Sequence, residues 1–110
     1  MRLRTIDLLS DEVRQALKKL GEHLRIARKR RRESLVLCAQ RLATTPTTIR
    51  KMEVGDPSVS AALYFGALSS YGFQEQFGQL GHPDFDALGK SLELSRLPKR
   101  IKSQPLDNDF

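Results

Sequence analysis

Residues 34–55 hold the pattern that most restricts the fold of this chain, because two short helices are predicted there with only a brief turn between them. Apolar side chains at helical spacing predict the first helix over 35–42 and the second over 46–54. Ala39, in the middle of the first helix, is small enough to let the two helices cross closely. This arrangement is typical of a helix-turn-helix unit, although such pairs also occur as structural corners.

The ends of both helices are marked by residues with a specific backbone role. Ser34 and Thr45 carry the hydroxyl groups that N-caps require, and Pro46 suits a first helical position because its missing N–H is not needed there. Ala43-Thr44 supplies the turn, and Gly55 ends the second helix. Local signals therefore bound the unit on every side.

The flanking sequence predicts more helices and no strand. An amphipathic helix follows the N-cap Ser10 and ends near Arg31, since apolar residues recur every three or four positions. Three further helices are expected, from Ser58 or Ser60 through Tyr71, from Phe73 to Leu80, and from the cap Asp84 to the residue before Pro98. We therefore expect an all-α fold, a bundle of five to six helices.

Positive charge is concentrated in the first half of the chain. Residues 1–57 contain 14 Lys and Arg against 7 Asp and Glu, whereas residues 58–110 contain 5 against 6. Six of the eight positions in 25–32 are Lys or Arg. Such asymmetry indicates a polyanionic partner, with nucleic acid ahead of a membrane surface. Taken alone, the run also fits a solvated helix face or a helix C-terminus, which favours cations.

Other classes of function find little support in the sequence. The single cysteine, Cys38, excludes an intramolecular disulfide and a Cys-based zinc site, and its inward position predicts a core residue rather than a redox switch. His23 and His82 have no ligand partners at metal spacing. No paired carboxylates, Ser–His–Asp set or phosphate-binding glycine loop stands out. We therefore expect no metal, no cofactor and no enzymatic activity.

The sequence also predicts a location. No apolar run approaches the roughly 20 residues that span a bilayer, and the N-terminus lacks the apolar core of a signal peptide. A basic, cysteine-poor chain of this kind fits the reducing cytosol. We therefore expect a cytoplasmic, nucleoid-associated protein that does not bind a membrane.

The stretch LRIARKRRRESLVLCAQRLATTPTTIRKMEVGDPSVS, residues 24–60, is similar to the XRE-type helix-turn-helix domains of bacterial and phage repressors. Three features carry the likeness: Ala39-Gln40-Arg41, Thr47-Thr48-Ile49, and the segment from Met52 to Pro57. The resemblance covers about residues 18–72. It implies a phage-repressor-like helix-turn-helix fold and binding to double-stranded DNA.

Further segments of the chain resemble a narrower group of regulators. Gly55 to Ser60, Ala87-Leu88-Gly89 and the segment from Arg96 to Arg100 look like the HipB-like regulators encoded beside HipA-type serine/threonine kinase toxins. This likeness implies a HipA-type kinase, or an associated small protein, as a further partner.

The XRE resemblance assigns roles position by position. It places four residues opposite base edges: Pro46, Thr47, Thr48 and Lys51. DNA phosphates are expected at Ser34, Thr45 and Arg50, with electrostatic support from Arg31 and Arg32. Arg28 and Glu53 match a structural ion pair. Leu35 departs from the family, which often has a polar residue there, so backbone N–H groups of Leu35 and Val36 would have to serve instead.

These inferences favour a sequence-specific repressor that binds a palindromic operator as a homodimer and autoregulates a toxin–antitoxin operon. An assembly module that holds the kinase, and a free-standing phage-type regulator, remain alternatives. The expected organisation is an arm over 1–12, a DNA-binding domain over 13–81, an amphipathic helix over 82–97 and a flexible tail over 98–110.

Overall fold

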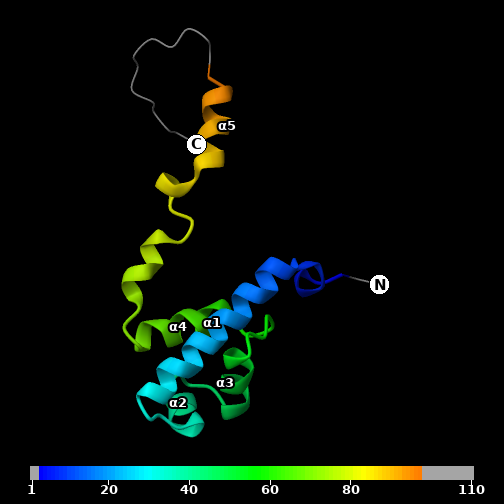
Figure 1. Cartoon of the computed structure of the whole chain (residues 1–110). Coiled ribbons are helices and arrows are strands. Elements are labelled where there is room, and N and C mark those ends of the chain that lie inside the picture. Colours follow the sequence, from blue (N-terminus) through cyan, green and yellow to red (C-terminus); the bar gives the residue numbers. More distant parts are fainter. Residues whose placement is uncertain (1–2, 98–110) are drawn as a thin grey trace. The chain divides into compact units, whose positions relative to one another are not determined.

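The computed structural model describes residues 3–97, and its regular elements are all helical (Figure 1). The α-helices are α1 (Asp11–Arg30), α2 (Leu35–Arg41), α3 (Pro46–Glu53), α4 (Ala61–Ser70) and α5 (Ala87–Ser95), and three 3-10 helices are η1 (Thr5–Leu8), η2 (Gln74–Gln79) and η3 (Pro83–Phe85). No strand occurs in this part of the chain. The predicted all-α fold of five to six helices is confirmed.

The first four α-helices begin in the same way. A Ser or Thr hydroxyl accepts a hydrogen bond from the backbone N–H three residues later, at distances of 3.1 to 3.2 Å. The capping residues are Ser10, Ser34, Thr45 and Ser60. Each cap satisfies one N–H that the helix itself leaves unpaired. Ser10, Ser34 and Thr45 were expected as caps, and Ser60 is one of the two residues, with Ser58, that were predicted as candidate caps of the fourth helix.

The same four helices also end alike, in paired backbone hydrogen bonds that close the last turn around a residue with positive φ. At α3 and α4 this residue is glycine, Gly55 and Gly72, as predicted. At α1 and α2 it is Arg32, with φ of 52°, and Ala43, with φ of 56°. Because a Cβ disfavours this conformation, the turns before and after α2 are strained.

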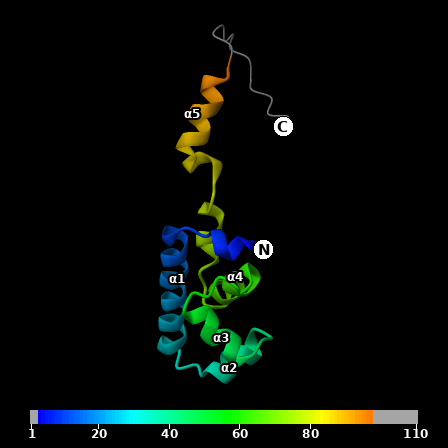
Figure 2. The same cartoon turned by 90° about the vertical axis from the view of Figure 1, so that its right-hand side faces the viewer.

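The core lies where the four helices meet. Its buried side chains come from α1 (Leu24, Ala27), α2 (Cys38, Ala39), α3 (Ile49, Met52) and α4 with its C-cap (Tyr64, Ala67, Tyr71). Figures 1 and 2 show α2 and α3 side by side near the C-terminal end of α1. The first turns of α1 are less buried, and Val13 is 43 % exposed.

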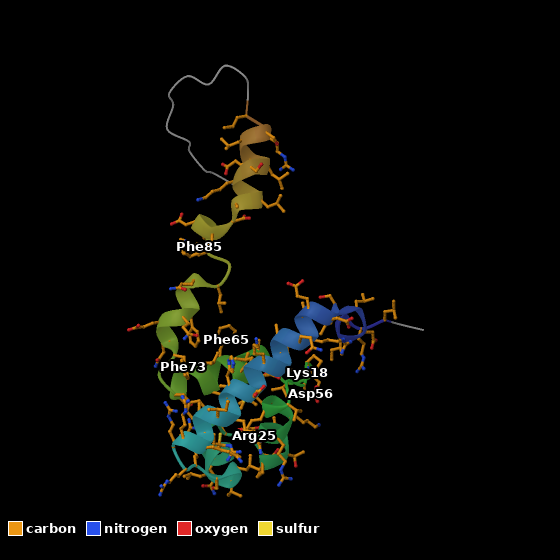
Figure 3. The ribbon with its side chains drawn as sticks, viewed as in Figure 1. Lys18, Arg25, Asp56, Phe65, Phe73 and Phe85 are labelled. Carbon is orange, nitrogen blue, oxygen red and sulfur yellow. The ribbon has the colours of Figure 1, made fainter. Side chains whose placement is uncertain are left out.

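Two glycines let α1 and the end of α3 approach each other closely. A Cβ at Gly21 would lie 2.6 Å from the Met52 carbonyl oxygen, and one at Gly55 would lie 2.5 Å from the Leu17 backbone. Figure 3 labels Lys18, which follows Leu17 on α1, and Asp56, which follows Gly55. The backbones of α1 and of the end of α3 are therefore in direct contact at these two glycines.

The described residues divide into two compact units, 3–75 and 76–97. The chain departs from the sequence expectation in two places, one at the boundary between the units and one in the second unit. The helix predicted over Phe73–Leu80 is the 3-10 helix η2, and Asp86, rather than Asp84, caps α5, with its Oδ1 2.8 Å from the Gly89 N–H. Asp84 lies inside η3, which spans Pro83–Phe85, so it does not directly precede α5.

The remaining expectations concern the chain ends and the membrane. The arm over 1–12 contains η1, held by a bond of 2.6 Å from the Arg14 guanidinium to the Ile6 carbonyl. The tail over 98–110 lies outside the described residues. None of the helices in residues 3–97 has the length and apolar character needed to cross a bilayer.

Candidate nucleic-acid interface

The helix α3 has two distinct faces. Ile49 and Met52 are fully buried and Glu53 is 7 % exposed, whereas Thr47, Arg50 and Lys51 are exposed. The exposed residues recur at intervals of three and one, so they lie on one side of the helix. The structure thus gathers three of the residues assigned to DNA contact into a single outward stripe.

The remaining residues at the start of α3 are used in its capping. Thr45 Oγ1 accepts from the Thr48 N–H at 3.2 Å, and the two threonine hydroxyl oxygens are 3.0 Å apart. One of the two hydroxyl groups donates its proton to the other, and the second proton is available to an outside acceptor. Pro46 and Thr48 are half-buried, so they flank the exposed stripe.

An open groove runs beside this stripe. It has a volume of about 490 Å³ and is bounded by the α2–α3 turn, α3, the loop after α3 and α4. Its polar lining consists of Thr44, Thr48, Lys51, Ser58 and Ser60. Hydroxyl and ammonium groups suit an oxygen-rich ligand such as a phosphate backbone. The sequence predicted Ser58 and Ser60 as candidate caps and as part of the HipB-like segment, but not beside α3, because their closeness to α3 depends on the fold.

The ion pair expected from the family resemblance is present inside the domain. Arg28 Nε and Nη2 donate to the two carboxylate oxygens of Glu53, at 2.7 and 3.0 Å. Arg28 Nη1 also donates to the Glu33 carbonyl at 2.8 Å. The bond to Glu53 raises the pKa of Arg28 above its ordinary value. This two-pronged pair ties α3 to α1 and removes Arg28 from the accessible charge.

Arg31 also has a structural role that the sequence did not reveal. Its guanidinium donates to the carbonyls of Ala27 and Tyr71, both at 2.9 Å, and lies 4.9 Å from the centre of the Tyr71 ring. The hydrogen bond to the Tyr71 carbonyl and the cation–π attraction thus join the ends of α1 and α4, while the bond to Ala27 stays within the last turn of α1. Arg31 was assigned to phosphate support, yet much of its bonding capacity is directed inward.

A second ion pair joins the α1–α2 loop to α2. Arg41 Nη2 and Nε donate to the Glu33 carboxylate at 2.6 and 2.8 Å, and the Tyr71 hydroxyl donates to the same carboxylate at 3.2 Å. The Arg41 bond lowers the pKa of Glu33, and burial raises the pKa of Tyr71. Residues this far apart in sequence give no local signal, so sequence analysis missed the cluster.

Besides Arg31, which is exposed but donates to two backbone carbonyls, four cations of the 25–32 run are exposed and form no ion pair among residues 3–97: Arg25, Lys29, Arg30 and Arg32. The last three of these cations lie within five positions before Ser34, whose hydroxyl oxygen accepts a hydrogen bond from the Leu37 N–H. Fewer cations are therefore accessible at this end of α1 than the six in the sequence run, because Arg28 is buried and Arg31 is directed inward. The accessible ones lie near the first turn of α2.

Nothing in the described residues resembles a metal centre, since no group of His, Cys, Asp and Glu side chains is arranged to hold an ion. Cys38 is fully buried, and burial raises the pKa of its thiol. No family model, curated protein or solved structure matches this chain.

Proposed function

We propose that this protein is a sequence-specific DNA-binding repressor of the XRE helix-turn-helix type, which acts on a palindromic operator as a homodimer. The observation that carries the proposal is the exposed stripe of α3. Thr47, Arg50 and Lys51 are free of the core and stand on a helix braced by the buried Arg28–Glu53 pair. A rigid short helix that presents polar and cationic side chains is suited to the major groove.

Each part of the surface would have a separate task. Lys51 and Thr47 supply base-edge contacts, while the exposed cations around Arg30 supply attraction to phosphates. One short helix reaches only a few base pairs, so two copies on a two-fold operator are needed for useful specificity. The chain thereby represses a promoter by occupying it.

The test is binding to the DNA upstream of the protein's own coding sequence, or to duplexes selected from a random pool. Lys51→Ala should weaken specific binding about 5- to 150-fold, the cost of one base contact, and leave far-UV circular dichroism unchanged. Lys19→Ala is the matched control, since Lys19 is an exposed lysine on α1. Equal affinities for the two variants, or an affinity that does not fall with salt, would contradict the proposal.

We further propose that the protein is the antitoxin-side component of a HipA-type kinase operon and autoregulates it. The support is the HipB-like sequence in the segments Gly55 to Ser60 and Ala87 to Gly89. Co-expression with a kinase encoded by the adjacent reading frame, followed by co-purification, tests this assignment. Failure to form a complex would leave a free-standing repressor.

A further inference from the structure

The loop between α1 and α2, residues 31–33, has a backbone conformation that its sequence does not favour. Arg32 has a φ of 52°, which lies in the left-handed region that a Cβ disfavours. Glycine would relieve this strain, yet the position holds an exposed arginine. A conformation of this kind persists only where the surrounding structure holds it. The contacts of the loop therefore show what keeps it in place.

Helix α1 holds the backbone of the loop. The Arg32 N–H donates to the Lys29 carbonyl at 3.0 Å, and the Glu33 N–H donates to the Arg28 carbonyl at 3.2 Å. Arg28 Nη1 in turn donates to the Glu33 carbonyl at 2.8 Å. The peptide groups on both sides of Glu33 are thus bonded to one residue of α1.

The Glu33 side chain ties the same loop to α2 and α4. Its carboxylate is 12 % exposed and accepts from Arg41 Nη2 and Nε at 2.6 and 2.8 Å and from the Tyr71 hydroxyl at 3.2 Å. The Arg41 guanidinium also lies 5.1 Å from the centre of the Tyr71 ring. Glu33, Arg41 and Tyr71, here called the Glu33 cluster, therefore connect the loop to the ends of two other helices.

A carboxylate at this place can act on DNA binding in two opposite ways. By charge alone, Glu33 weakens the attraction of the nearby exposed cations Lys29, Arg30 and Arg32 for phosphate. By position, it strengthens binding, because cations on a loop that is already ordered lose less freedom when they bind. The geometry favours the second role, since Arg41 already balances the Glu33 charge through a two-pronged pair.

We propose that the residues of the Glu33 cluster are positioning residues for DNA binding, which hold the 31–33 loop in its strained conformation and so order Arg30 and Arg32 for contact with phosphates. This inference rests on the proposed function for its ligand. It adds that a glutamate and a tyrosine raise the affinity for DNA through the loop rather than by contact with DNA. The strain at Arg32 is then the cost of presenting a guanidinium from that position.

The first test removes one negative charge at each of two places. Glu33→Gln should weaken binding to a duplex that the wild type binds by roughly 5- to 150-fold, the cost of ordering two long side chains. Glu22→Gln is the matched control, because Glu22 is an exposed glutamate on α1, and it should bind as tightly as the wild type or more tightly. Tyr71→Phe changes no charge and should also weaken binding. Urea unfolding checks that every variant is folded in the assay.

Arg32→Gly separates the ligand role from a structural one. The variant should have a higher urea midpoint, because it relieves the positive φ. It should also bind DNA more weakly, with a slope of log K against log salt reduced by about 0.9, the loss of one phosphate contact. A residue with a structural role alone would not move stability and affinity in opposite directions. An unchanged salt slope overturns the inference.

Amide hydrogen exchange, followed by NMR without DNA, separates this inference from the function it rests on. The amides of residues 32 and 33 should exchange faster in Glu33→Gln and Tyr71→Phe, while those of Ile49 and Met52 in α3 keep their wild-type rates. Tighter DNA binding by Glu33→Gln, or unchanged exchange in the loop, overturns the inference. A loop that both variants loosen, in a protein whose wild type binds no DNA, overturns the repressor function and leaves the cluster as the holder of the loop.

Discussion

Removal of one partner from the Arg28–Glu53 pair should cost the domain a large part of its stability. The two side chains are only 10 % and 5 % exposed. In Glu53→Leu the Nε and Nη2 donors of Arg28 lose their acceptors in a place that water hardly reaches. An uncompensated buried charge of this kind costs about 3–5 kcal/mol. Typical stabilities of 0.05–0.15 kcal/mol per residue give the unit 3–75 roughly 4–11 kcal/mol in total.

The double variant Arg28→Met/Glu53→Leu should recover most of that loss, because replacing both charges with apolar groups of similar volume is often neutral or stabilising. Urea unfolding at pH 7, followed by far-UV circular dichroism, gives the free energy of unfolding for each variant. Arg25→Met is the control, since Arg25 is an exposed arginine on the same helix and its loss should stay within about 0.5 kcal/mol.

Two results would refute this reasoning. A loss below about 1 kcal/mol in Glu53→Leu would mean that the pair does not brace α3. A double variant as unstable as the sum of the two single variants would mean that the partners are not coupled. The double variant should also keep wild-type DNA affinity, because Arg28 is assigned to the scaffold rather than to the ligand.

The strained turn and the second ion pair each give a further prediction. Ala43→Gly should raise the free energy of unfolding by about 1 kcal/mol, because Ala43 is exposed and has a φ of 56°; an unchanged urea midpoint would contradict the strain. Glu33 has a lowered pKa in the folded state, so its contribution is present above the unfolded pKa and is lost as pH falls through the folded pKa. Glu33→Gln should therefore lower stability at pH 7 and flatten its acid dependence in urea titrations, and a parallel pH curve would refute it.

Sequence reasoning succeeded where the controlling interaction is local. Ser34, Thr45 and Ser60 each cap through a bond to the residue three positions on, so the necessary information lies within four residues. The same holds for Gly55, which ends α3 in a conformation that only glycine adopts without strain. Boundaries marked in this way agree with the structure to within about two residues.

Contacts between segments that are distant in the sequence could not be predicted. Tyr71 lies near Glu33 and Arg31 only because α4 folds back onto the end of α1, and no spacing rule connects them. Arg32 and Ala43 end helices without the glycine that usually marks such a turn. For the candidate interface, the α3 residues follow from the motif, whereas the groove with Ser58 and Ser60 depends on how α4 packs.

The burial of Cys38 has a practical consequence. Its Sγ lies 3.6 Å from the Tyr71 hydroxyl inside the core, and its thiol has both a raised pKa and no contact with solvent. Thiol reagents react with an exposed thiolate, which is the nucleophile, so Cys38 in the folded chain should not react with them. A cysteine introduced on the surface can then carry a spectroscopic label without replacement of Cys38. The rate at which Cys38 itself is slowly modified then measures how often the core between α2 and α4 opens.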